Sequence, residues 1–314
     1  MRILDRNAVF NIVLKCALFV LVFACCFCLL AFAVGVNAVL SAVISAVPAF
    51  CAVLLFSFLL RYTRFYYGYY SFVSSFLFTA KEGKVYCPCC GKHFEGFKDE
   101  KFYTDGAHYN PAMFSSARQD VMCDFCRSAP RHRIIAEWAK KNEDMLRNSK
   151  ILYFAPELSM MLWFKRHGIK VKTADLFDKR ADLKLDLTSI DLPDESEDII
   201  FCNHVLEHVS DYNVALSELS RVLRKGGMLI ISFPIDNASE SVREQETGSV
   251  EERIRLFGQY DHLRVFGKDS RQMLEKAGFD VEVIKKDDMP AEIVFDDGPA
   301  DYDTNEIFCC IRKQ

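Results

Sequence analysis

Two pairs of cysteines in this chain have the spacing of metal ligands. Cys87 and Cys90 form one CxxC pair, Cys123 and Cys126 form the other, and residues 91–122 lie between them. Each pair places two thiolates on one tight turn, and two such turns complete a tetrahedron around zinc. Four thiolates leave no open coordination position. The spacing therefore predicts a structural zinc site in a small zinc-ribbon-like module.

Other residues near these pairs are also able to bind the metal ion. Cys89 can substitute for a neighbouring cysteine, and His93 or His108 can replace one thiolate. Unliganded buried cysteines or a redox pair are the alternative interpretations. Gly91 follows the first pair, where the turn often needs a positive φ.

Polar side chains follow several strand-like segments in the C-terminal half. They are Asp175 after the second segment, Asp186 after a third, and Asn203 with His204 after the fourth. Ligands in open parallel sheets bind beyond the carboxyl ends of the strands. An acidic residue at the end of the second strand usually binds a ribose diol, so Asp175 is the predicted cofactor anchor.

The elements that position these residues alternate between strand and helix. The strand-like runs are Ile151–Ala155, Ile169–Ala174, Asp198–Cys202, Met228–Phe233, Val281–Ile284 and Ile307–Ile311. Helical periodicity covers Leu158–Arg166 and a segment from Tyr212 that should end at a glycine cap, Gly226-Gly227. This alternation predicts an α/β domain with a doubly wound, mostly parallel sheet over residues 131–314.

The N-terminal region has a different composition. Residues 16–36 and 38–60 contain no charged side chain, and each is long enough to cross a bilayer, which takes about 20 apolar residues. Arg2, Arg6 and Lys15 precede the first span, and Arg61 and Arg64 follow the second. Because positive residues favour the cytoplasmic side, we predict a two-helix transmembrane hairpin within residues 1–80 with both ends in the cytoplasm. A cleaved signal peptide is the alternative.

Charge and cysteine usage restrict the environment of the rest of the chain. The net charge is −4, from 39 Lys and Arg against 43 Asp and Glu, so nucleic acid is an unlikely partner. The 13 cysteines are scattered through the hairpin, residues 81–130 and the α/β domain, as is typical of a reducing compartment. We therefore expect the α/β domain on the cytoplasmic side of the membrane.

Several stretches together resemble a known family. DIIFCNHVLEHV, the helix after it, SRVLRKGG and MLIISFP are similar to class I S-adenosylmethionine-dependent methyltransferases. The wider run from the cysteine pairs to FGQYDHLRVFG resembles a bacterial subgroup with an N-terminal zinc-ribbon-like segment. The likeness runs from about residue 85 to about residue 285, and implies S-adenosylmethionine as a cofactor and an antiparallel last strand.

The resemblance also implies which residues bind the cofactor. They are Phe154, Ala155, Pro156 and Glu157 in the first loop, Asp175 and Leu176 at the ribose, Asp186 and Leu187 at the adenine, and Asn203 and His204 at the methionine end. The first loop lacks the family's glycines. Since S-adenosylmethionine carries no phosphate, only close backbone approach is needed, and Ala155 with Pro156 permits it. Glu157 is a candidate to bind the methionine amino group.

Methyl transfer from a sulfonium is an in-line displacement that depends on positioning and on exclusion of water. A general base is needed only for an acceptor that holds its proton near neutral pH. The candidate catalytic residues are His204, Asp261 and His262, with His208 one helical turn after His204. Glu207 either orients one of these histidines or caps a helix. The polar stretch 237–252 is either a lid or a mobile surface loop.

Together these features predict a membrane-anchored methyltransferase with three parts: residues 1–80, 81–130 and 131–314. An anchor places the unknown acceptor at the membrane, as a lipid, a lipid-linked sugar, a quinone-like molecule or a membrane protein. The alternative from another class is a catalytically inactive, membrane-tethered docking protein with the same fold. A nicotinamide-dependent enzyme is disfavoured, because no GxGxxG follows the first strand.

Overall fold

The computed structural model describes residues 83–100, 118–245, 249–284, 289–290, 293, 302–303 and 306–314. The chain divides into two units, 1–72 and 73–314, and all the described residues lie in the second. The predicted hairpin over 16–36 and 38–60 lies outside the described residues. Among those described, none of the helices has the length and apolar character to cross a bilayer.

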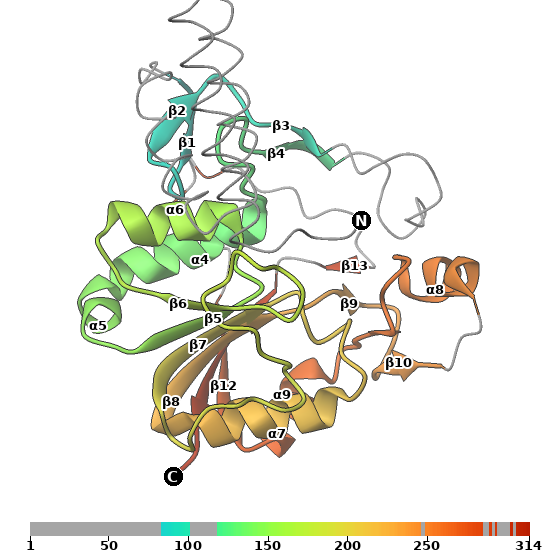
Figure 1. Cartoon of the computed structure of the whole chain (residues 1–314). Helices are drawn as coiled ribbons and strands as arrows, with labels where there is room; N and C mark the ends of the chain where they lie inside the picture. Colours follow the sequence, from blue (N-terminus) through green and yellow to red (C-terminus); the bar gives the residue numbers. More distant parts are fainter. Residues whose placement is uncertain are drawn as a thin grey trace, which may run out of the picture. The chain divides into compact units, whose positions relative to one another are not determined.

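A six-stranded sheet forms the centre of the second unit (Figure 1). Its strands are β5 (Ile151–Phe154), β6 (Lys172–Ala174), β7 (Glu197–Asn203), β8 (Leu223–Ser232), β12 (Phe279–Ile284) and β14 (Ile307–Arg312). The order is β12-β14-β8-β7-β5-β6. The four strands β6, β5, β7 and β8 are parallel to one another, whereas β14 is antiparallel to both β8 and β12. The mostly parallel α/β sheet and its antiparallel last strand are confirmed.

Six helices lie in the described part, and four of them cover the two faces of the sheet. The six are α4 (Pro130–Lys141), α5 (Glu143–Arg147), α6 (Leu158–Arg166), α7 (Tyr212–Val222), α8 (Val250–Phe257) and α9 (Ser270–Lys276). In Figure 1, α4 and α6 lie on one side of the sheet, and α7 and α9 on the other. Asp211 begins α7, because its side chain accepts hydrogen bonds from the backbone N–H groups of Asn213 and Val214.

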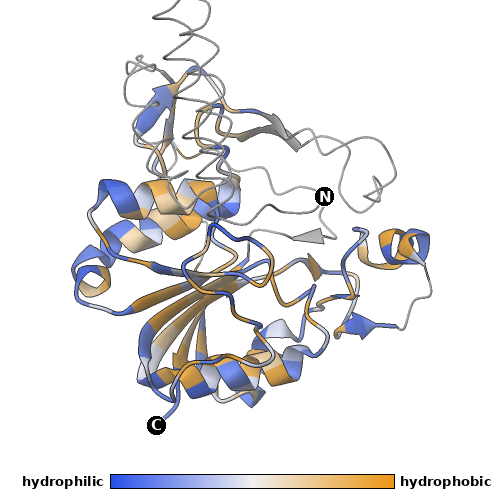
Figure 2. Cartoon of the chain, in the orientation of Figure 1, coloured by the Kyte–Doolittle hydropathy of each residue, from blue (hydrophilic) through white to orange (hydrophobic). Residues whose placement is uncertain are grey.

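The alternation of side chains along the strands builds two apolar layers. Leu152 and Phe154 of β5 join a buried cluster with side chains of α7 and α9, such as Leu216 and Leu274. Tyr153 faces the opposite layer, where aromatic rings from β7, α4 and α6 pack together. Figure 2 shows the apolar residues concentrated on the central strands. A strand with both faces covered in this way has no polar face, which explains the nearly continuous apolar runs in the sequence.

Short strands complete the described part. β1 (Val85–Cys87) pairs with β2 (Lys92–Phe94), β3 (Lys98–Glu100) with β4 (Arg118–Met122), β9 (Ile235–Asp236) with β13 (Tyr302–Asp303), and β10 (Arg243–Glu244) with β11 (Arg264–Val265). All four pairs are antiparallel.

Three sequence expectations need correction. The third parallel strand before Asp186 is reduced to a single bridge between Leu183 and Ala174. The helix α7 ends at Val222 rather than at the glycines, because Leu223 is already extended and begins β8. Gly226 instead takes a positive φ of 69° at an irregularity of the β7–β8 pairing. Finally, residues 205–210 form a turn and not a helix.

Candidate functional site

Two residues at the carboxyl ends of neighbouring strands have strained backbones. Ala155 after β5 has φ 47°, and His204 after β7 has φ 52°. Each is held by the next strand: Ala155 N–H donates to the carbonyl of Ala174 at 2.9 Å, and His204 N–H to that of Ser232 at 2.8 Å. Left-handed φ values in non-glycine residues cluster at functional sites. The strain marks the edge of the sheet where the sequence predicts cofactor binding.

A polar network joins three strands at this edge. Ser232 Oγ donates to Asn203 Oδ1 at 2.9 Å, and Asn203 Nδ2 lies 3.5 Å from the hydroxyl of Tyr153. That hydroxyl donates to Glu157 Oε2 at 3.1 Å. Asn203 is 2% exposed, so its side chain serves mainly this network. Tyr153 did not stand out in the sequence, because its hydroxyl lies inside an apolar run.

Glu157 also receives hydrogen bonds from the start of α4. Arg131 donates to Glu157 Oε1 at 3.0 Å, and His132 Nε2 lies 2.5 Å from the same oxygen. Burial raises the pKa of Glu157, but His132 and Arg131 lower it more, so the pKa lies well below its usual value. Its side chain is 20% exposed. This carboxylate therefore connects the first loop to α4, in addition to any contact with a cofactor.

Asp175 follows β6, at the position expected for a ribose partner. Its Oδ1 accepts the backbone N–H groups of Phe177 and Asp178, both at 2.7 Å. Leu176 is half-buried, whereas Phe177 is 82% exposed beside it. An exposed phenylalanine next to this carboxylate is a candidate apolar contact for an adenine. Sequence reasoning missed it, although an aromatic residue soon after an acidic strand end was visible.

The remaining predicted cofactor residues differ in how accessible they are. Asp186 Oδ1 accepts hydrogen bonds from Thr188 N–H at 2.8 Å and Thr188 Oγ1 at 2.7 Å, which shapes a turn. Leu187 is 4% exposed and Phe154 is 2% exposed, and both belong to the apolar core. Pro156 is half-buried. Phe154 and Leu187 can therefore contact a ligand only through their backbone atoms, because their side chains are buried in the core.

The histidine candidates gather around one buried carboxylate. His204 Nδ1 lies 3.3 Å and His208 Nε2 4.0 Å from Glu207 Oε1, and the Glu207 side chain is 1% exposed. His208 and His262 pack edge to face with ring centres 4.8 Å apart. Asp261 Oδ2 lies 3.5 Å from His208 Nδ1. Sequence reasoning assigned Glu207 only a supporting role, but the structure places it between His204 and His208.

Burial and neighbouring charges set the protonation of this cluster. Burial raises the pKa of Glu207, but the surrounding histidines, with His204 first, more than offset this and hold the pKa at about 2. Burial lowers the pKa of His262 to about 4, although Glu207 opposes it. His262 is therefore neutral at pH 7 and carries a lone pair on one ring nitrogen.

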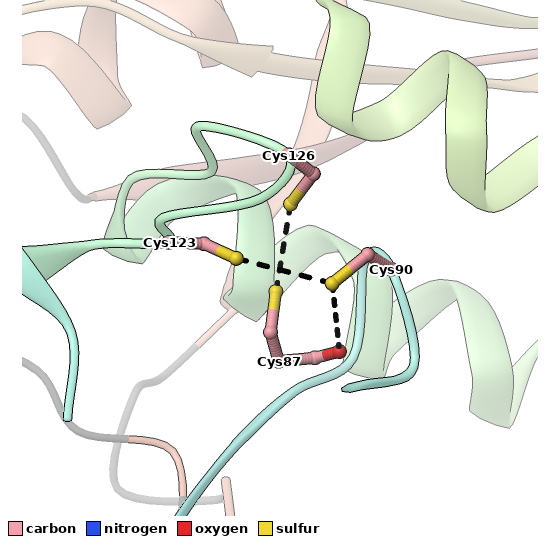
Figure 3. Close-up of side chains that lie close together, drawn as sticks. All are labelled: Cys87, Cys90, Cys123 and Cys126. Carbon is pink, nitrogen blue, oxygen red and sulfur yellow. Dashed lines mark hydrogen bonds between the residues drawn. The ribbon is translucent and has the colours of Figure 1, made fainter. Parts of the chain in front are cut away.

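The four predicted cysteine ligands converge from β1, β4 and the two turns that follow them (Figure 3). The Sγ atoms of Cys87 and Cys126 lie 3.6 Å apart, and those of Cys90 and Cys123 lie 3.8 Å apart. All four lie within 4.8 Å of one another. A tetrahedral zinc with Zn–S of about 2.3 Å needs sulfurs about 3.8 Å apart, so these thiols fit the ion.

The two cysteine turns have the same backbone form. Gly91 N–H donates to the carbonyl of Cys87 at 2.7 Å, and Arg127 N–H donates to that of Cys123 at 3.0 Å. Both residues have positive φ, 69° for Gly91 and 58° for Arg127. Cys89 is buried next to Cys87 and Cys126 but is not one of the four thiols that all lie within 4.8 Å of one another, and His93 is exposed on β2. His108 lies outside the described residues.

Arginines connect the cysteine cluster to the α/β domain. Arg166 of α6 donates to the carbonyls of Pro88 at 3.2 Å and Cys89 at 2.9 Å. Arg133 of α4 is fully buried, donates to the carbonyl of Ser128 at 2.9 Å and lies over the ring of Phe97. These contacts join the cysteine cluster to the same helices that flank the first loop.

A separate groove of about 780 Å³ lies beside α7 and α9. Its lining includes Asn213, Ser217, Asp269 and Met273, and none of the predicted cofactor or catalytic residues. The carboxyl edge of the sheet is therefore a better candidate site than this groove, because the strained and buried polar groups are there.

Comparison with known proteins supports the same edge. Residues 160–231 match a family model described as a methyltransferase domain. No curated protein sequence matches the chain. The matched segment runs from α6 through β8 and includes Asp175, Asp186 and Asn203.

Solved structures of low identity are also similar. The 1,6-didemethyltoxoflavin-N1-methyltransferase of Burkholderia thailandensis is 14% identical over 58% of this chain and 78% of its own, with a TM-score of 0.38. The YcgJ protein of Bacillus subtilis is 15% identical over 58% of this chain and 99% of its own, with a TM-score of 0.38. The phosphoethanolamine N-methyltransferase 2 of Haemonchus contortus is 12% identical over 58% of this chain and 53% of its own, with a TM-score of 0.40.

The matched segment holds the strand ends at Asp175 and at Asn203 and His204, whereas the predicted first loop, 154–157, lies before it. Residues 160–231 thus resemble a methyltransferase domain, and the match supports an S-adenosylmethionine-dependent methyltransferase.

Proposed function

We propose that this protein is a membrane-anchored methyltransferase that binds S-adenosylmethionine across the carboxyl ends of β5, β6 and β7. The observation that carries the proposal is the match of residues 160–231, which include Asp175 and His204, to a methyltransferase domain. Ala155 precedes the match, at the end of the neighbouring strand β5. The cofactor supplies an activated methyl group on its sulfonium. The protein's part is to orient this group and to exclude water.

Specific residues support this role. Ala155 brings its backbone to the ligand without a bulky side chain, and the carboxylate of Asp175 is the expected acceptor for two ribose hydroxyls. His204, with its side chain 19% exposed, stands after β7 at the methionine end. Because Nδ1 of His204 faces Glu207, its imidazole is oriented and can take a proton from a hydroxyl acceptor.

The four cysteines support a structural zinc. The distances of 3.6 Å and 3.8 Å between sulfurs of different CxxC pairs suit a tetrahedral ion, and four thiolates leave no position for substrate. The ion would fix the two turns that Arg166 and Arg133 join to α6 and α4. In this proposal zinc stabilises the first loop indirectly and takes no part in methyl transfer.

Membrane anchoring rests on the sequence of residues 16–60 alone. An anchor would place the site near lipids, lipid-linked sugars, quinone-like molecules or membrane proteins. Extraction of membranes from expressing cells with alkaline carbonate tests this part. An integral hairpin stays in the membrane pellet, whereas release of the full chain into the supernatant would contradict the anchor.

Transfer of a labelled methyl group tests the activity. The purified full chain, incubated with methyl-labelled S-adenosylmethionine and a membrane extract, should label one class of extracted molecule. For a hydroxyl acceptor, His204→Gln should slow labelling by about 10²-fold or more, because a positioned base contributes at least that factor. His167→Gln is the matched control, because His167 stacks on Trp163 of α6 and is not one of the site residues. Equal labelling with and without the protein would contradict the proposal.

A further inference from the structure

Three side chains beside the proposed methyl-transfer site have the donor atoms of a metal centre. One donor atom each from Glu207, His208 and His262 lies within 4.8 Å of the other two. Glu207 is 1% exposed and His262 3% exposed, whereas His208 reaches partly to solvent. The first two follow β7 and the third follows α8, so the chain brings together donors that lie more than fifty residues apart.

The backbone holds these two segments together. Leu263 N–H donates to the carbonyl of Glu207 at 2.8 Å. The fully buried guanidinium of Arg264 donates to the carbonyls of Leu206 at 2.8 Å and Ser210 at 3.0 Å. The positions of the donors are thus fixed by the fold itself, as a pre-organised site requires.

Hydrogen bonds also fix which nitrogen of each histidine carries its proton. His262 Nδ1 lies 2.9 Å from the carbonyl oxygen of Phe257, and His208 Nδ1 lies 3.2 Å from that of Asp261. A carbonyl only accepts, so both rings are protonated at Nδ1 and present Nε2 as the electron-pair donor. A backbone carbonyl that orients a histidine in this way is a usual neighbour of metal ligands.

The carboxylate between them has few partners. Neither oxygen of Glu207 accepts a hydrogen bond of good geometry from the part of the chain that the structure describes. His204 Nδ1 lies at ion-pair distance, 3.3 Å from Oε1, whereas Oε2 has no hydrogen-bond partner among the described residues. Buried carboxylates are normally hydrogen-bonded, paired with a charge or bound to a metal. The site therefore has an acidic donor that a cation would satisfy.

We propose that Glu207, His208 and His262 bind one divalent transition-metal ion. Two imidazoles and one carboxylate suit Mn²⁺, Fe²⁺, Co²⁺ or Zn²⁺. Donors around such an ion lie about 3 to 3.5 Å apart at ligand distances near 2.1 Å, so binding would draw the three side chains inward. Three protein ligands leave open positions for water or for an oxygen of another molecule.

The position of this ion would give it a role in acceptor binding. His204 adjoins both the ion site, through Glu207, and the methionine end of the proposed cofactor site. An open coordination position there would hold an oxygen of the methyl acceptor and lower the pKa of its hydroxyl. This role rests on the proposed function, whereas metal binding itself does not.

Titration of the full chain with Mn²⁺, followed by the electron paramagnetic resonance signal of free Mn²⁺, tests the site. Thiolates bind Mn²⁺ weakly, so the cysteine cluster, kept loaded with zinc, does not contribute. We expect one Mn²⁺ per chain. His208→Gln and Glu207→Gln should each weaken binding at least tenfold, and His208 is exposed enough for its substitution to leave the fold intact.

Glu143→Gln is the matched control, because Glu143 pairs with His167 at 2.9 Å outside the site, and it should leave Mn²⁺ binding unchanged. The proposal is overturned if the natural chain binds no Mn²⁺ even at millimolar concentrations of the ion. It is also overturned if both site variants bind as tightly as the natural chain. No S-adenosylmethionine is present, so failure here is distinct from failure of the methyltransferase proposal.

Discussion

At the scale of single residues, the site is marked by backbone strain and by buried polar groups. Ala155 and His204 both have left-handed φ, at 47° and 52°. For a residue with a side chain, this conformation costs roughly 1–2 kcal/mol. The strain at Ala155 occurs where the resembling family has glycine, so this chain retains the backbone conformation without the residue that adopts it most easily.

Replacement of Ala155 tests this view of the first loop. Ala155→Gly should raise the free energy of unfolding by roughly 0.5–1 kcal/mol, because it relieves left-handed strain of about 1–2 kcal/mol and loses part of the gain to glycine's greater unfolded entropy. Ala277→Gly, at a residue with φ −75°, should lower it by about 0.5–1 kcal/mol. Urea denaturation measures both. Equal destabilisation by the two glycines would contradict a strained Ala155.

The pKa of Glu157 leads to a pH-dependence. Its folded pKa lies below its unfolded value, so ionised Glu157 stabilises the fold above about pH 4.3. This contribution is lost as the pH falls towards the folded pKa. Glu157→Gln should therefore reduce stability at pH 7 and flatten the loss between pH 5 and pH 3. Glu251→Gln on exposed α8 should do neither. Urea denaturation midpoints at each pH measure this effect. The same pH dependence in the natural chain and in Glu157→Gln would contradict it.

At the scale of elements, the first loop is connected to the cysteine cluster through α4 and α6. Arg131 and His132 at the start of α4 bind Glu157, and Arg166 near the end of α6 binds the turn of the first cysteine pair. The cluster and the loop therefore share two rigid elements. Loss of the ion should loosen the hold of both helices on the cofactor loop.

Substitution of single cysteines separates the ligands from their neighbour. Full chain purified from cells should contain one more zinc than the Cys123→Ser variant, because three thiolates no longer complete the tetrahedron. Cys89→Ala should keep the zinc, since Cys89 stands outside the four clustered thiols. Metal analysis of the pure proteins gives the count. Loss of zinc in Cys89→Ala, or retention in Cys123→Ser, would show that the ligand set is different.

The sequence predicted elements better than the contacts between them. Apolar runs such as Ile151–Phe154 are local signals for buried strands, and the CxxC spacing is a local signal for the cysteine turns. The third strand was wrongly expected, because residues around Leu183 form only one bridge at the edge of the sheet. The Tyr153–Glu157–His132 network was not predictable, since it depends on how α4 packs against β5.

At the scale of the whole molecule, one edge of the sheet collects several unusual features of the described part. The strained residues Ala155 and His204, the buried Glu207 and the ribose candidate Asp175 all follow the carboxyl ends of parallel strands, as ligand sites in open α/β sheets do. The cysteine cluster is joined through Arg133 and Arg166 to α4 and α6, the helices that flank the first loop at this edge. This placement agrees with the match of residues 160–231 to a methyltransferase domain.

Calorimetric titration of the full chain with S-adenosylmethionine tests the central claim most directly. Asp175→Asn is the sharpest variant, because asparagine keeps one oxygen for the N–H groups of Phe177 and Asp178 but loses the second acceptor for ribose. Asp191→Asn, on an exposed loop, is its control. We predict micromolar binding that Asp175→Asn weakens at least tenfold and Asp191→Asn leaves unchanged. A folded, zinc-loaded chain that does not bind S-adenosylmethionine would contradict the account and favour a docking protein.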